Sequence, residues 1–201
     1  MTRRSERTWL VLLLGGPSGA GKTAVGCRLA RHFSVGFAEV DDFQCLLERM
    51  TTPEQLPQLH VWRTNPTFEQ LTAEEIAMHV QAASEAMSPG LDAVIGNHLE
   101  TKMPVVLEGD FIHPALAAQT SFSGQANGGR VRSTFLYEPD EEQYVRNFLL
   151  REPERGGQSK RARVSRLHGQ WLKQEAERLG LPVVAARPWD TVLERIVSAI
   201  S

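Results

Sequence analysis

Residues 16–23 read Gly-Pro-Ser-Gly-Ala-Gly-Lys-Thr and fit the pattern G-x-x-x-x-G-K-S/T at every position. A short apolar run, 9–14, precedes this stretch, and a pattern with Val25, Leu29 and Phe33 on one helical face follows it. In this setting glycines let successive backbone N–H groups curl around phosphate oxygens, and the helix directs its positive dipole end at them. The pattern and its context therefore predict a binding site for a nucleoside triphosphate.

Each residue of this P-loop has an expected role in binding ATP and Mg²⁺. Lys22 is expected to reach the β- and γ-phosphates, and the Thr23 hydroxyl to bind Mg²⁺. The residues expected to cradle the phosphates are Gly16, Pro17, Ser18, Gly19, Ala20 and Gly21. A guanine-reading N-K-x-D segment is absent from the sequence, which argues against a GTPase.

Five short apolar runs alternate along the chain with longer stretches of helical spacing. These candidate strands lie at 9–14, 36–40, 104–107, 131–137 and 182–185. Such alternation is typical of a parallel sheet covered by helices. The sequence therefore predicts an α/β fold.

Helix signals are clearest in the middle and at the end of the chain. Thr72 opens a capping box with Glu75, Ser88-Pro89 is expected to start a separate helix through about residue 99, and a last helix follows Asp190. The stretch 121–130 is rich in Gly, Ser, Gln and Asn, so we expect a surface loop there.

Length and composition indicate one ordinary globular domain, 1–201. The chain has 201 residues, with 41% hydrophobic and 23% charged residues. Its 22 Lys and Arg against 24 Asp and Glu give a net charge of -2, which argues against nucleic acid or an anionic membrane as a partner. We expect a small molecule as partner, and a monomer or homodimer.

Neither the cysteines nor the N-terminus suggests secretion. Cys27 and Cys45 are too few for a disulfide scaffold and lack metal-ligand spacing. The basic segment 1–7 precedes an apolar run of only six residues, shorter than the usual stretch of about seven to fifteen in a signal peptide. The sequence therefore predicts a soluble, uncleaved protein of the cytoplasm.

Carboxylates follow two of the predicted strands. The third strand ends in Leu107-Glu108-Gly109-Asp110, which departs from a Walker B segment and leaves open which carboxylate serves the metal. We favour Glu108 for Mg²⁺ and keep Asp110 as a candidate on the substrate side. Asp41 and Asp42 follow the second strand, and ligands of parallel sheets bind beyond the carboxyl ends of strands.

Asp41 is therefore the candidate general base for an acceptor hydroxyl, with Asp42 beside it on the substrate side. The alternative is that either aspartate only caps the following helix.

A basic segment, 151–166, is the candidate lid. It holds six basic and two acidic residues, with Gly156-Gly157 as a possible hinge. Arginines on a closing loop would neutralise the transferring phosphoryl group, although a solvated helix end is the alternative. Arg151 and Arg155 are the first candidates, and Arg187, after the last strand, is expected beside the adenine.

With these segments the chain resembles P-loop small-molecule kinases over nearly its whole length. The layout is similar to gluconate, shikimate and adenylate kinases and chloramphenicol phosphotransferase, and the step Glu108-Gly109 also to 2-phosphoglycerate kinase. The resemblance implies a three-layer sandwich with five parallel strands in the order 2-3-1-4-5. It also implies a lid with some of Arg151, Arg155, Arg161 and Arg163, and Asp41 on the acceptor side.

The long insert 43–103 is expected to build the acceptor pocket, where Arg63 is a candidate for binding an anionic group. The expected activity is transfer of the γ-phosphoryl group of ATP to a hydroxyl of a small molecule. The alternatives are a nucleoside or nucleotide kinase and a regulatory ATPase without an acceptor. The sequence does not identify the acceptor.

Overall fold

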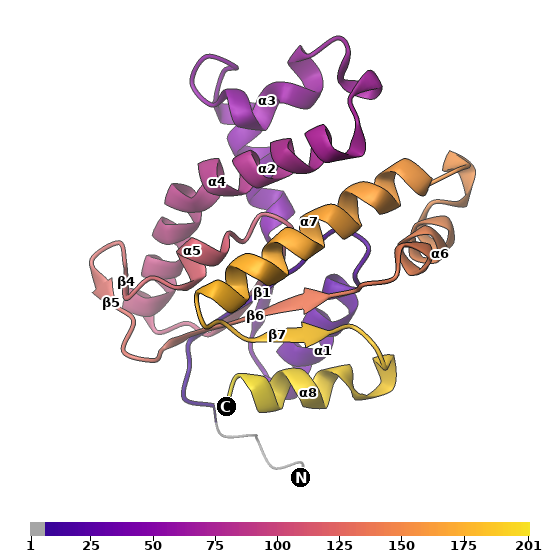
Figure 1. The fold of residues 1–201 in the computed structure, drawn as a ribbon. Coiled ribbons are helices and arrows are strands. Elements are labelled where there is room, and N and C mark those ends of the chain that lie inside the picture. Colours follow the sequence, from indigo (N-terminus) through magenta and orange to yellow (C-terminus); the bar gives the residue numbers. More distant parts are fainter. Residues whose placement is uncertain (1–6) are drawn as a thin grey trace.

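The computed structural model describes residues 7–201, so residues 1–6 of the basic segment 1–7 lie outside the described residues. The chain forms a five-stranded parallel sheet covered on both faces by helices (Figure 1). The strands are β1 (Val11–Gly15), β2 (Gly36–Glu39), β3 (Val105–Gly109), β6 (Val131–Tyr137) and β7 (Val183–Ala185). Their order is β2-β3-β1-β6-β7, which confirms the predicted order 2-3-1-4-5 for the strands of this sheet.

The central strand shows why the sheet is buried on both faces. Side chains of a strand alternate between the two faces, so an unbroken apolar run supplies both cores. Val11 and Leu13 join a core with α4 (Ala73–Thr101), α5 (Pro114–Ala117) and α7 (Ser159–Arg178). Leu12 and Leu14 join the opposite core, with α1 (Lys22–Phe33) and α8 (Val192–Ala199).

Two helical segments stand beyond the carboxyl ends of the strands. The first contains α2 (Val40–Met50), α3 (Pro57–Thr64) and the short η1 (Phe68–Gln70), and corresponds to the front of the predicted insert (Figure 1). The second is α6 (Glu141–Arg151), which follows β6. These segments flank the P-loop, which leaves the end of β1.

The predicted helix break at Ser88-Pro89 is wrong, because α4 continues through Pro89 as one helix of 29 residues. Proline removes one backbone N–H from the helix, but the apolar face continues across it with Met87, Leu91 and Ile95 all buried. Burial of this face outweighs the local cost. The Ser88 hydroxyl donates a hydrogen bond to the Ser84 carbonyl, one turn back along the helix.

The predicted loop 121–130 contains a small hairpin of β4 (Ser121–Phe122) and β5 (Gln125–Ala126). Phe122 is fully buried in the core beside α4, so a hydrophobic anchor holds this polar stretch. Both cysteines are free thiols. Within residues 7–201, no helix combines the length and the apolar character needed to cross a membrane.

Candidate functional site

The P-loop connects β1 to α1, and its shape depends on glycine. Gly21 caps the start of α1 with φ at 94°, in the left-handed region that other residues rarely adopt. A Cβ atom at Gly21 would lie 2.7 Å from the Trp189 ring. The backbone at this position therefore tolerates only glycine, and the N-terminus of α1 opens toward the cavity above the sheet.

Lys22 is buried in the middle of this site. Its Nζ lies 2.5 Å from Asp110 Oδ1 and donates a second hydrogen bond to the Pro17 carbonyl at 3.1 Å. Burial opposes the positive charge, but the carboxylates of Asp110 and Glu108 outweigh it and raise the pKa of Lys22. The amine therefore stays protonated at neutral pH, ready to bind phosphate oxygens.

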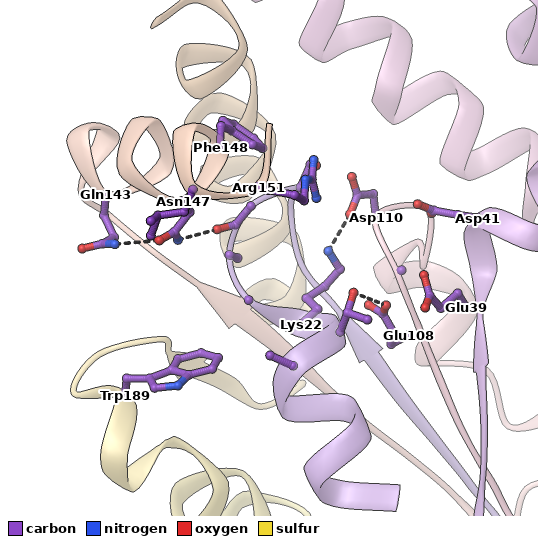
Figure 2. Close-up of a pocket in the computed structure, with 18 of the residues that line it drawn as sticks. Lys22, Glu39, Asp41, Glu108, Asp110, Gln143, Asn147, Phe148, Arg151 and Trp189 are labelled. Carbon is purple, nitrogen blue, oxygen red and sulfur yellow. Dashed lines mark hydrogen bonds and ion pairs between the residues drawn. The ribbon is translucent and has the colours of Figure 1, made fainter. Parts of the chain in front are cut away.

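Thr23 and Glu108 meet beside Lys22, and the Thr23 hydroxyl donates to Glu108 Oε1 at 2.7 Å (Figure 2). The other carboxylate oxygen, Oε2, is buried with no hydrogen-bond partner. Burial raises the pKa of Glu108, against the opposing effects of Lys22 and the Thr23 hydroxyl. A buried carboxylate oxygen without a partner, next to a hydroxyl, suits a hard cation such as Mg²⁺.

No cluster of three metal-ligating side chains occurs within residues 7–201. Mg²⁺ in phosphate-binding sites commonly takes one or two protein ligands and fills its remaining positions with phosphate oxygens and water.

Asp41 lies in the first turn of α2 rather than at the end of β2. The helix N-cap is Glu39, which makes no capping hydrogen bond through its side chain, and the first turn holds Asp41 and Asp42. Asp41 opens into the cavity, whereas Asp42 does not line it. Partial burial and the neighbouring Asp110 raise the pKa of Asp41 to about 6, although Lys22 acts in the opposite direction.

A cavity of about 760 Å³ joins these groups. Trp189 lines one end, the P-loop lines the floor, and Glu39 and Asp41 line the other end (Figure 2). Arg187 also lines the cavity, with its Cζ 5.8 Å from the centre of the Trp189 ring. Glu39 is paired in register with Glu108 on the adjacent strand, so their side chains stand next to each other at the carboxyl edge of the sheet.

Half of the predicted lid segment is the beginning of α7, and its arginines are held by carboxylates. The remainder is the last residue of α6, the short η2 (Pro153–Arg155) and the glycine pair. Arg151, Arg155 and Arg161 all pair with Glu152, at 3.0, 2.8 and 3.0 Å. Only Arg151 of these three lines the cavity. The lid function stays a prediction, but in this conformation Arg155 points to Glu152 and not to the site.

The two other predicted arginines differ in position. Arg187 lines the cavity, and its Nε lies 3.4 Å from the buried carboxylate of Glu138. Arg63 does not line the cavity and instead pairs with the buried Glu48 at 2.8 Å. The order of charges in the sequence does not indicate that Arg63 would form an ion pair with Glu48 of the preceding helix, α2.

Sequence reasoning missed several residues that shape the site. From α6, the Asn147 side chain donates to the Gly19 carbonyl at 2.7 Å and accepts from Gln143 at 2.8 Å. Trp189, in η3 (Trp189–Thr191), packs against Gly21. Gly169 of α7 lies against the P-loop, where a Cβ atom would be 2.8 Å from Pro17 Cγ. The absence of a side chain at Gly169 is visible in the sequence, but its reason is not.

In Gly169→Ala, overpacking against Pro17 is expected to lower the free energy of unfolding by about 1–3 kcal/mol. The higher helix propensity of alanine would offset up to about 1 kcal/mol of this loss. The added methyl group would push Pro17 and weaken ATP binding as well. Thermal unfolding and the KM for ATP measure both effects. Gly90→Ala in α4 is the matched control, because its Cβ would lie 3.7 Å from Leu47, an ordinary contact. An equally stable Gly169→Ala protein with unchanged KM would contradict this account of the contact.

Comparison with known proteins gives partial matches in sequence and full-length matches in structure. No family model matches the chain. A 2-phosphoglycerate kinase of Pyrococcus horikoshii is 29% identical over 118 residues, which cover 55% of this chain and 38% of that protein. A shikimate kinase of Xylella fastidiosa is 36% identical over 63 residues, 31% of this chain and 33% of that protein. The chain thus matches about a third of the length of these curated relatives.

A solved structure of a shikimate kinase from Acinetobacter baumannii in complex with shikimate aligns with 95% of this chain, over 94% of its own chain. Its TM-score is 0.52 at 16% sequence identity. The chain has the fold of the P-loop kinases. At this identity the structural likeness concerns the fold alone, and what the site does follows from its own residues.

Proposed function

We propose that the protein is an ATP-dependent phosphotransferase that moves the γ-phosphoryl group to a hydroxyl group of a small molecule. One observation carries the proposal: Lys22, the pair of Thr23 and Glu108, and Asp41 surround a single cavity. Cations at the phosphate end and a carboxylate of raised pKa at the other end are what in-line transfer to a hydroxyl requires.

In this reaction the acceptor hydroxyl oxygen bonds to the γ-phosphorus, the bond from that phosphorus to the β,γ-bridging oxygen breaks, and ADP leaves. Asp41 accepts the hydroxyl proton, and Lys22 stabilises the charge on the phosphoryl oxygens. Asp110 holds Lys22 in place until phosphate binds, through their contact at 2.5 Å. Arg151, at the cavity wall, is the lid arginine best placed to reach the phosphates.

Thr23 and Glu108 are the residues that would hold Mg²⁺, supported by the buried, unpartnered Oε2 of Glu108. When bound there, Mg²⁺ would neutralise charge on the phosphates and orient them. In Glu108→Gln the amide oxygen can still accept the hydrogen bond from the Thr23 hydroxyl, but the negative charge of the carboxylate is lost.

We expect Glu108→Gln to raise the Mg²⁺ concentration for half-maximal turnover about tenfold or more. A titration with MgCl₂ at saturating ATP measures this. Glu142→Gln, an exposed change on α6 outside the cavity, is the control. An unchanged Mg²⁺ requirement in Glu108→Gln would assign the metal to another carboxylate.

The pKa of Asp41, about 6, predicts that the reaction slows as the pH falls below this value. The base works only when deprotonated, so kcat/KM for the acceptor should fall about tenfold per pH unit below this pKa and level off above it. Comparing the pH dependence of kcat/KM in the wild type and in Asp41→Asn distinguishes titration of Asp41 from titration of the nucleotide. A limb that persists unchanged in Asp41→Asn would belong to another group.

The similarity to a 2-phosphoglycerate kinase and a shikimate kinase supports phosphoryl transfer to a small hydroxylated compound. Acceptor-dependent release of ADP from ATP tests it, with a panel of hydroxylated metabolites. A protein that hydrolyses ATP at one slow rate whatever compound is added would contradict the proposal and favour a regulatory ATPase. The free thiols support a reducing compartment, and we propose the cytoplasm.

A further inference from the structure

The acceptor end of the cavity is acidic. Glu39, Asp41 and Asp110 line it, and Glu108 stands next to Glu39 at the strand ends (Figure 2). The basic residues nearest to this end are Lys22, already paired with Asp110 at 2.5 Å, and Arg151, paired with Glu152 at 3.0 Å. The four carboxylates therefore outnumber the two cations before any ligand enters.

The electrostatics of Asp41 agree with this arrangement. Burial is the largest cause that raises the pKa of Asp41, and the charges of Asp110, Glu39 and Asp42 add to it, against the opposing charge of Lys22. The three carboxylates around Asp41 therefore contribute a negative potential at this position. An acceptor bound against Asp41 would experience the same potential.

Arginines that could reverse this charge are engaged elsewhere. Arg63 pairs with Glu48 at 2.8 Å, and Arg163 pairs with Glu74 at 3.2 Å. Arg166 donates to Glu141 at 2.9 Å. None of these three arginines lines the cavity. The two arginines that do line it are Arg151, paired with Glu152, and Arg187, whose Cζ lies 5.8 Å from the centre of the Trp189 ring.

We propose that the phosphoryl acceptor is an amine-bearing alcohol, such as an amino alcohol or amino sugar, and not a hydroxy acid or a phosphorylated acid. The inference rests on the proposed phosphotransfer at the same site. An ammonium group would pair with Glu39 or Asp110 while a neighbouring hydroxyl faces Asp41. A carboxylate or phosphate on the acceptor would lie among like charges, which disfavours it.

Three open-chain compounds that differ in one terminal group test the charge of the acceptor directly. They are 1-amino-1-deoxy-D-glucitol, D-glucitol and D-gluconate. Their dissociation constants are measured by calorimetry with the protein saturated with ADP and Mg²⁺. We expect the amine to bind tightest, and gluconate about tenfold more weakly or worse. 2-Phosphoglycerate is the added anionic probe, and it should bind no better than gluconate.

Glu39→Gln should reduce the difference in affinity between the amine compound and gluconate, because the amine should bind more weakly and gluconate more tightly. Glu54→Gln, an exposed change away from the cavity, has the same charge change and should leave the gap intact. Equal affinities for the three compounds, or tighter binding of gluconate or 2-phosphoglycerate, would overturn the assignment. A different result would contradict the proposed function: no acceptor, whether cationic or anionic, would increase the release of ADP.

Discussion

Lys22→Met is expected to lower ATP-dependent turnover by about three orders of magnitude or more. The ammonium group is buried at the floor of the cavity, where we propose that the phosphates bind, and its raised pKa keeps it charged at neutral pH. Met fills a similar volume but supplies no charge. Steady-state ADP release, measured at saturating ATP and Mg²⁺, gives the size of the loss.

The control is Lys173→Met, which removes a lysine on α7 that pairs with Glu177 at the surface. It should turn over at the wild-type rate. Lys22→Met also leaves the carboxylates of Asp110 and Glu108 without their cation, so thermal unfolding must show that the variant is folded. A folded Lys22→Met protein with near wild-type turnover would refute the assignment of residues 16–23 to the phosphates.

Asp41→Asn is expected to lower kcat by about two orders of magnitude or more, with little change in ATP affinity. The amide has nearly the same shape and still reaches the acceptor, but it cannot take a proton from a hydroxyl. Because Asp41 lies at the end of the cavity away from Trp189 and Arg187, nucleotide binding should remain. Turnover and the Kd for ATP, measured separately, separate the two effects.

Asp42→Asn is the matched control for this substitution. The two aspartates are neighbours in the first turn of α2, but only Asp41 lines the cavity. Both changes remove one negative charge from the same helix end, so a general effect on α2 would appear in both variants. Similar losses in the two variants would assign the effect to the helix, and an unchanged kcat in Asp41→Asn would move the base elsewhere.

The three inner strands of the sheet were predictable because they are buried on both faces. A strand of this kind is an apolar run on its own, so β1, β3 and β6 are visible without knowledge of their neighbours. The turn of residues 16–23 was predictable because its glycines act through local backbone conformation, with positive φ at Gly16, Gly19 and Gly21. The continuous α4 was not, because the contacts of Met87 and Leu91 that override Pro89 come from other parts of the chain.

The arginines show where sequence reasoning about the site fails. A cluster of positive charge predicts a binding surface, but ion pairs depend on which carboxylates lie nearby. Glu152 forms ion pairs with three arginines of the predicted lid, and Glu48 forms one with Arg63. Trp189 was missed because its contact with Gly21 joins two turns more than 150 residues apart in the sequence.

Transfer of the γ-phosphoryl group to an acceptor is the most direct test of the account. ATP labelled with ³²P at the γ-position would be incubated with the protein, Mg²⁺ and an amine-bearing polyol, and the products separated. The account predicts labelled phosphorylated polyol in equal amount to the ADP formed, and none with Lys22→Met. Label recovered only as inorganic phosphate, across amine, neutral and acid acceptors alike, would contradict it.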